Sequence, residues 1–235
     1  MPPEDTTNLR PQASGASLIA SGLNSTLPVI DRADVQLAVV RQFPVDGLEQ
    51  QRTVAGATWA AWNATPWPDA LMSRTCYLST DQQRVLTYEQ WSADQPDVED
   101  AAAIAYRLYR SGVRQDAPVP GCIVIVEVQT DGHDTARRWI DTVFDALASE
   151  TTLHPGGISG HFHVSLDGTR VLNYAEWVDE ASHVEAVSGT GSVGRGPAWR
   201  RVQTMPGVVN LGFRRFTACG TRERSDLAGS NVLRQ

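Results

Sequence analysis

Two stretches of the chain show the pattern of a β-hairpin, and the other elements are arranged around them. Residues 157–177 (GISGHFHVSLDGTRVLNYAEW) centre on Asp167-Gly168, a dipeptide typical of a two-residue type I′ turn. Such a turn pairs Val164 with Val171 and Phe162 with Asn173, and directly opposed residues share a face of the sheet. One face then carries Phe162, Val164, Val171, Asn173, Ala175 and Trp177, and the other carries His161, His163, Leu172, Tyr174 and Glu176. Neither face is simply polar, so we expect both to be covered.

The same pattern occurs earlier in the chain. Residues 71–91 (LMSRTCYLSTDQQRVLTYEQW) align with residues 157–177 without gaps at an offset of 86, and eight of the 21 positions are identical. Because the flanking segments also agree in character, we interpret the chain as a duplicated module. Two copies indicate a tandem domain rather than a solenoid.

The remaining periodicity predicts the same element order in both copies. In the first copy it predicts strands at 34–43 and 104–113, a helix at 48–64 and a short helical segment at 94–103. In the second copy it predicts an almost wholly apolar strand at 122–128, a helix at 134–149, a helical segment from 180 and a strand at 208–217. The order strand, helix, strand, strand, helix, strand is the ferredoxin-like βαββαβ arrangement.

These elements predict an α+β protein made of two tandem ferredoxin-like modules. The helix-free face of each sheet is also apolar, so we expect the two sheets to face one another in an intrachain α+β barrel. We place module one at residues 33–113, a Pro-containing linker at 114–120 and module two at 121–220. Residues 1–32, rich in Pro, Ser, Thr and Asn, are expected to form a disordered arm, and residues 221–235 a tail.

Composition narrows the classes of partner. The formal net charge of −7 argues against nucleic acid as a partner. All 20 basic residues are Arg, and the absence of Lys excludes a P-loop lysine and a Schiff-base lysine. Three widely spaced cysteines without a CxxC motif fit reduced thiols in the cytoplasm. We find no long apolar run and no signal-peptide pattern, so we expect no membrane association.

Asn173 and Trp177 are the first candidates for chemistry. They lie four residues apart on one strand and therefore on one face, which also bears Phe162 and Val164. If helices cover this face, an amide and an indole N–H point into an apolar cavity that suits a planar aromatic ligand with a carbonyl or a developing oxyanion. The alternative is that Trp177 belongs to the core and the Asn173 amide is satisfied by the backbone.

The hairpin with its Asn-x-x-x-Trp motif resembles the antibiotic-biosynthesis monooxygenase superfamily, the small ferredoxin-like oxygenases of aromatic polyketide pathways. "YRLYRS" at the end of module one and "PGVV…RRFT" at the end of module two resemble its two-module members. The resemblance implies that Asn173 holds the substrate's oxygen as it ionises and that Trp177 lines the pocket and helps to place dioxygen. Module one keeps Trp91 but has Thr87 in place of the Asn, so its site is expected to be degenerate.

Two further family positions differ in this chain. Some members have a Tyr six residues after the Trp, where this chain has His183. The family's downstream Arg has no unambiguous counterpart here, because Arg195 and Arg200 both lie near the expected position. We expect catalytic roles for Asn173, Trp177 and His183. The residues expected to bind the substrate are Phe162, Val164, Val171, Trp139, Phe144 and Arg195. A general base could be His183, His161 or His163, because imidazole titrates near neutrality.

The function expected from this resemblance is a monooxygenase that oxidises a polycyclic aromatic polyketide of anthrone or hydroquinone type with dioxygen, without metal or cofactor. One alternative uses reduced flavin on the same fold, and a second is a non-oxidative polyketide cyclase or binding module. The family habit leaves a homodimer open, although the two modules can cover one another.

Two other motifs are weaker evidence for a binding site. His161 and His163 share a face with Glu176, but no third metal ligand is clearly placed, so we expect a polar patch in the barrel interior rather than a metal site. Gly189, Gly191 and Gly194 match the dinucleotide-binding fingerprint by letter. They do not follow a convincing strand, and Gly196-Pro197 should stop any helix, so we expect a flexible loop.

Overall fold

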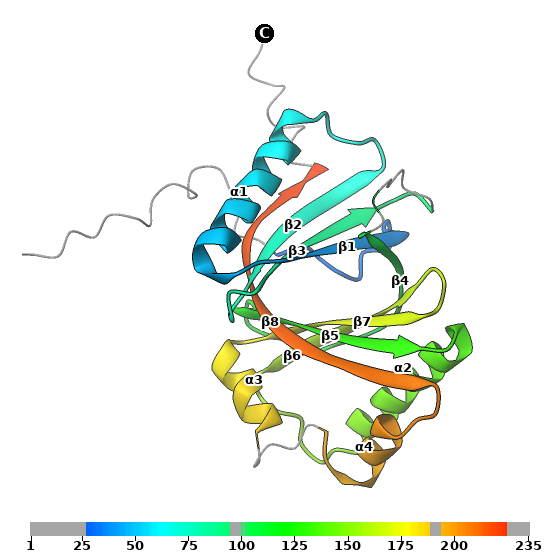
Figure 1. Cartoon of the computed structure of the whole chain (residues 1–235). Helices are drawn as coiled ribbons and strands as arrows, with labels where there is room; N and C mark the ends of the chain where they lie inside the picture. Colours follow the sequence, from blue (N-terminus) through cyan, green and yellow to red (C-terminus); the bar gives the residue numbers. More distant parts are fainter. Residues whose placement is uncertain (1–26, 95–99, 101, 189–193, 225–235) are drawn as a thin grey trace, which may run out of the picture.

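The computed structural model of the chain describes residues 27–94, 100, 102–188 and 194–224 (Figure 1). The first half contains β1 (Leu37–Pro44), α1 (Gly47–Ala64), β2 (Leu71–Ser79), β3 (Arg84–Trp91) and β4 (Ile104–Val113). The second half contains β5 (Cys122–Thr130), α2 (His133–Ala148), β6 (Gly157–Ser165), β7 (Arg170–Trp177), α3 (Glu180–Val187), α4 (Gly196–Gln203) and β8 (Val208–Glu223). The predicted α+β class is confirmed.

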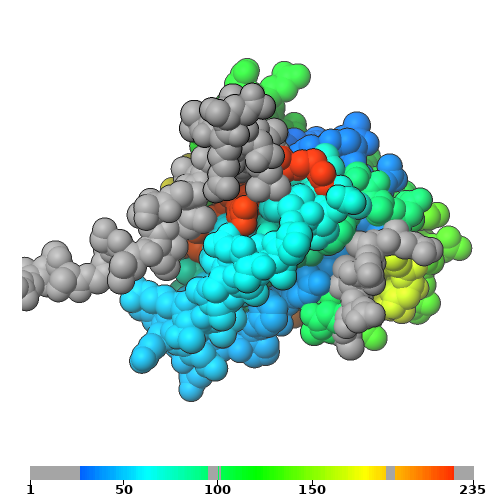
Figure 2. All heavy atoms as spheres, turned by 90° about the horizontal axis from the view of Figure 1, so that it is seen from above, coloured from blue at the N-terminus to red at the C-terminus, as the bar shows by residue number. Residues whose placement is uncertain are grey.

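The eight strands form one antiparallel sheet that closes on itself. Their order is β1-β3-β2-β8-β5-β7-β6-β4, and β4 also pairs with β1. The halves meet where β2 pairs with β8 and where β4 pairs with β6. The helices lie outside the sheet: α1 covers the first half and α2, α3 and α4 cover the second (Figure 1). Seen from above, α1 lies across the outer face of the first half, with the end of β8 beside it (Figure 2).

The second hairpin has the predicted register but a wider turn. Val164 opposes Val171, and Phe162 opposes Asn173. Four residues, not two, connect the strands, and of these only Gly168 has a positive φ, of 72°. The predicted type I′ turn is therefore wrong. The Asp167 carboxylate, which accepts hydrogen bonds from the Ser165 hydroxyl (2.6 Å) and the Thr169 N–H (3.0 Å), holds the wider loop.

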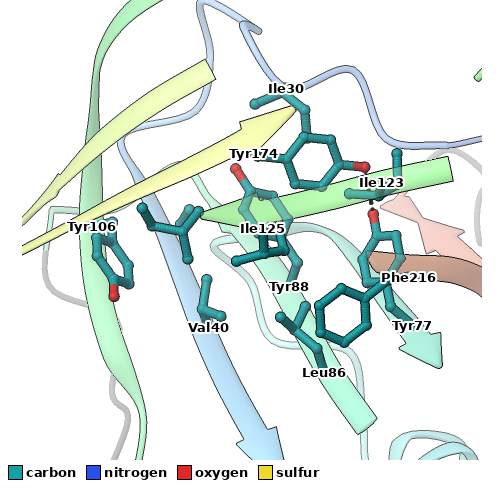
Figure 3. Close-up of a cluster of buried hydrophobic side chains, with 12 residues drawn as sticks. Ile30, Val40, Tyr77, Leu86, Tyr88, Tyr106, Ile123, Ile125, Tyr174 and Phe216 are labelled. Carbon is teal, nitrogen blue, oxygen red and sulfur yellow. Dashed lines mark hydrogen bonds between the residues drawn. The ribbon is translucent and has the colours of Figure 1, made fainter. Parts of the chain in front are cut away.

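Side chains from both halves form the core inside the sheet (Figure 3). Buried tyrosines need partners for their hydroxyls. Tyr77 and Tyr174 are hydrogen bonded to one another at 2.9 Å, and Tyr88 is bonded to His163 at 3.1 Å. Burial raises the pKa of all three phenols, so they remain neutral hydrogen-bonding groups. Ile30, which we expected in a disordered arm, packs in this core with 3% of its surface exposed. The prediction of a disordered arm is wrong for the segment around Ile30, because this apolar side chain is buried in the core. Residues 1–26 lie outside the described residues.

Other boundaries also differ from expectation. A helix, α4, begins at Gly196 where we predicted a stop, because Pro197 occupies the first turn, whose N–H groups have no partner within the helix. β8 continues through residues 221–223, which we had assigned to the tail. The predicted helical segment at 94–103 falls largely outside the described residues, as do Gly189 and Gly191. No helix in the described part of the chain is both long and apolar enough to cross a bilayer.

Candidate functional site

Asn173 lies on the outer face of β7, between two apolar clusters. Its neighbours across the sheet are Phe162 on β6 and Val126 on β5. Phe162 belongs to the cluster under α2 and α4, whereas Val126 packs against the cluster that contains Trp177. Within the described residues, the Asn173 Oδ1 atom is buried and has no hydrogen-bond partner. Since buried amide oxygens nearly always accept a hydrogen bond, this atom is available to a ligand or to water.

Gly160 lies close beside this amide. A Cβ atom added at Gly160 would lie 3.2 Å from Phe162 Cε2 and 3.4 Å from Asn173 Oδ1. Contacts of that length are at or below the optimum for heavy atoms, so any side chain here would crowd both groups. The absence of a side chain at position 160 therefore spares the Phe162 ring and the Asn173 oxygen a crowding contact.

In the first half, the equivalent place is filled. Position 74 corresponds to 160 at the offset of 86, and Arg74 is 4% exposed there. Its guanidinium lies 5.0 Å from the Trp62 ring and 4.7 Å from the Trp67 ring, and Nη2 donates to the Trp62 carbonyl at 2.6 Å. Burial, with a smaller contribution from Arg222, lowers the pKa of Arg74 to about 10. The first half thus carries a stacked cation at the position where the second half has Gly160.

Aromatic and branched side chains form the wall beside Phe162. The Phe162 ring centroid lies 5.3 Å from that of Phe144 and 6.4 Å from that of Trp139. The Trp139 N–H donates to the Val202 carbonyl at 3.3 Å, which fixes the indole against α4. Five of the predicted substrate-binding residues therefore come together here, namely Phe162, Val164, Val171, Trp139 and, at the edge of the cluster, Phe144.

Trp177 and His183 form a second aromatic group. Their ring centroids are 4.8 Å apart, and the His183 ring lies 4.9 Å from that of Phe213 on β8. Arg215 Nε donates to His183 Nδ1 at 2.9 Å, so the proton of the neutral imidazole is on Nε2. Burial first, then the charges of Arg215 and His154, lowers the pKa of His183 to about 4. Its lone pair is already used, so in this geometry His183 is a donor and not a base.

The other predicted histidines lie on the opposite face of the sheet. His163 Nδ1 donates to the His161 carbonyl at 2.9 Å, which leaves Nε2 to accept from Tyr88. His161 Nδ1 is hydrogen bonded to Ser111 at 2.8 Å. Burial lowers the pKa of both imidazoles to about 4. Because they point into the barrel, neither can reach a ligand beside Asn173. The described residues contain no group of three potential metal ligands.

Arg195 stands apart from the other predicted residues. It is exposed at the start of α4, and its Nη2 donates to the Ser188 carbonyl at 3.3 Å.

Sequence reasoning missed Gly160 and Arg215. The glycine could have been found by comparing position 160 with Arg74 in the repeat, whereas the Arg215–His183 bond joins residues 32 apart and has no local signal.

Comparison with known proteins finds likeness in structure only. No protein-family model matches the chain, and no curated protein matches it. A solved structure described as an anthrone oxidase-like protein superposes with a TM-score of 0.62 at 15% identity, covering 81% of this chain and 94% of that one. A protein of Fusobacterium nucleatum provisionally named a monooxygenase superposes with a TM-score of 0.52 at 8% identity, covering 82% and 96%. At these identities the likeness shows a shared fold.

Proposed function

We propose that the chain is a monooxygenase that oxidises a polycyclic aromatic polyketide intermediate, of anthrone or hydroquinone type, with dioxygen. The observation that carries the proposal is the buried, unpartnered amide oxygen of Asn173 beside Gly160, next to an aromatic wall. Flat apolar rings fit such a wall, and one polar group fixes their orientation. The names of the two structural neighbours agree with an oxygenase.

The chain's own residues can support this reaction without metal or cofactor. An electron-rich hydroxyaromatic anion can reduce dioxygen directly; an anthrone and one O₂ then give an anthraquinone and one water. Asn173 Oδ1 accepts a hydrogen bond from a phenolic hydroxyl, and a half-turn of the amide presents Nδ2–H to the oxyanion. We assign Trp177, four residues along β7 from Asn173, the role of helping to place dioxygen. We assign His183 a positioning role, because Arg215 occupies its lone pair.

Dioxygen uptake with 1,8-dihydroxyanthrone and no other additive tests the proposal. Asn173→Ala should lower turnover about a hundredfold, the usual effect of removing one group that stabilises an oxyanion. Thr87→Ala is the matched control, since Thr87 is the first-half counterpart of Asn173, and it should stay within about twofold of wild type. Equal activity of Asn173→Ala and the wild type would contradict the proposal.

The same assay separates the alternatives. Turnover that requires a flavin reductase would favour a reduced-flavin oxygenase. Product formation without dioxygen would favour a polyketide cyclase. Neither outcome would change the fold or the position of the aromatic wall.

We also infer that the two halves are copies of one module. β2–β3 and β6–β7 have the same register shift, between Leu71 and Ser73 and between Gly157 and Ser159. The hydrogen bonds inside the barrel also repeat: Tyr77 bonds to Tyr174, and their counterparts 86 positions away, His163 and Tyr88, bond to one another. With two copies closing one barrel, the active unit is a single chain in the cytoplasm, and a homodimer is not required.

A further inference from the structure

One end of the barrel interior opens into a hollow of ≈ 210 Å³ that is separate from the Asn173 site. Its apolar floor is formed by Ile125 and Phe216, which belong to the interior core (Figure 3). Its polar lining comes from four strands: Gln42 on β1, Arg84 on β3, Glu127 on β5 and Arg214 on β8. Ile125 and Phe216 are only 3% and 1% exposed, so the surface that the hollow offers is mainly polar and carries groups of both charges.

The two charged groups face the hollow without pairing. Arg84 Nη1 donates only to the carbonyl of Gln83, at 2.8 Å, and within the described residues no carboxylate pairs with this guanidinium. The Glu127 carboxylate likewise has no hydrogen bond or ion pair there, and none joins it to Arg84. A second guanidinium at the rim, that of Arg214, is already paired with Asp81. Half-buried charges of opposite sign that do not meet leave room for a molecule that contacts both.

The rim is opened by a β-bulge in β8. The register of β8 against β5 shifts between Glu127 and Val128, at Leu211 and Gly212. Gly212 has a φ of 96°, and its N–H donates to Asn210 Oδ1 at 2.8 Å, which stabilises the bulge. A Cβ added at Gly212 would meet nothing within 4 Å, so the entrance beside it is open. Bulges are over-represented beside functional sites, where they end pairing and redirect side chains.

The asymmetry of the hollow follows from divergence of the halves. Gln42 opposes Leu86 and Glu127 opposes Leu172, and these two leucines are counterparts at the offset of 86. Gln42 and Glu127 thus occupy corresponding strand positions, yet only the second half carries a carboxylate. A symmetric pair of identical residues could not present one negative and one neutral group to a single ligand.

We propose that this hollow binds a free α-amino acid. The ligand carboxylate pairs with Arg84 and the ammonium pairs with Glu127. A simple anion would leave Glu127 unpaired and a simple amine would leave Arg84 unpaired, so a zwitterion is the better complement. The hollow has the volume of roughly seven water molecules, which suits a molecule of leucine's size. Because Asn173 faces outward, this site is independent of the proposed oxygenase chemistry.

Isothermal titration calorimetry of the full chain tests the proposal with three probes. L-Leucine should bind with a stoichiometry of one per chain. N-acetyl-L-leucine, which lacks the ammonium, and 3-methylbutylamine, which lacks the carboxylate, should each bind about tenfold or more weakly, because each leaves one charge in the hollow unpaired. These probes are compared on the wild-type protein, so the result does not depend on any variant folding.

Variants then assign the contacts. Glu127→Gln and Arg84→Gln should each weaken leucine binding about tenfold or more. Arg170→Gln is the matched control, since Arg170 is the counterpart of Arg84 and does not line the hollow, and it should leave binding within about twofold. Absence of saturable leucine binding to the wild type, or leucine binding that survives Glu127→Gln or Arg84→Gln unchanged, would overturn the proposal.

Discussion

Replacing Gly160 by alanine should reduce oxidation of an aromatic substrate more than it reduces stability. The added methyl group would lie 3.2 Å from Phe162 Cε2 and 3.4 Å from Asn173 Oδ1. The first distance is short of the 3.5–4.0 Å optimum, so the Phe162 ring must move by a few tenths of an ångström. Overpacking of this kind costs about 1 kcal/mol of the free energy of unfolding.

The effect on substrate comes from the second contact. A methyl group in van der Waals contact with Asn173 Oδ1 covers the free acceptor, so a substrate hydroxyl loses one hydrogen bond. A hydrogen bond of about 1–1.5 kcal/mol corresponds to a roughly tenfold lower kcat/KM. Gly160→Leu, which extends further over the amide, should lower kcat/KM by about a hundredfold or more.

Gly112→Ala is the matched control for crowding. Gly112 opposes Gly160 across β4 and β6, and a Cβ added there would lie 3.2 Å from Phe144 Cε1 without approaching Asn173. Urea denaturation should give both alanine variants a similar loss of stability. Dioxygen uptake should fall further in the Gly160 variant, because Gly112→Ala displaces only the wall residue Phe144 and does not touch Asn173. Equal activity losses in the two variants, or no loss in Gly160→Ala, would refute the role of this space.

Two further predictions concern the barrel interior and the buried imidazoles. The buried histidines His161, His163 and His183 have a pKa of about 4 in the folded protein, below the unfolded value of about 6.5. Between these two pH values the unfolded chain therefore binds more protons than the folded chain. The free energy of unfolding should therefore fall by about 2 kcal/mol per histidine from pH 7 to pH 5, and His163→Gln should remove one such contribution. A midpoint of urea denaturation that does not change with pH would contradict this prediction. Tyr77→Phe and Tyr174→Phe should each lower the free energy of unfolding by about 1–2 kcal/mol, because each leaves the other tyrosine's hydroxyl without its partner. The double variant should lose less stability than the sum of the two single variants. Strict additivity in this double-mutant cycle would show that the hydrogen bond contributes nothing.

The hairpins were predictable because the alternation of side chains and the turn residues agreed in both copies of the repeated segment, residues 71–91 and 157–177. Alternation of side chains fixed which residues share a face, and the observed register places Phe162 opposite Asn173 as expected. The turn was not predictable from Asp167-Gly168 alone, because its width depends on hydrogen bonds that the Asp167 carboxylate accepts from Ser165 on β6 and from Thr169 in the loop.

The site was predictable only as far as strand faces determine it. The face of Asn173 and Trp177 followed from their spacing, and the wall around Phe162 came together as expected. The protonation of His183 depends on Arg215 from a distant strand, and the burial of Arg74 depends on two indoles from another element and the loop after it. Such contacts are set by tertiary packing and leave no periodic signal.

A crystal structure of the protein soaked with 1,8-dihydroxyanthraquinone tests the central claim most directly. The account predicts one ring system against Phe162 in the second half, with an oxygen within hydrogen-bonding distance of the Asn173 amide, and none beside Arg74. A ring system bound beside Arg74 or elsewhere, with the Asn173 oxygen bonded only to water, would contradict it.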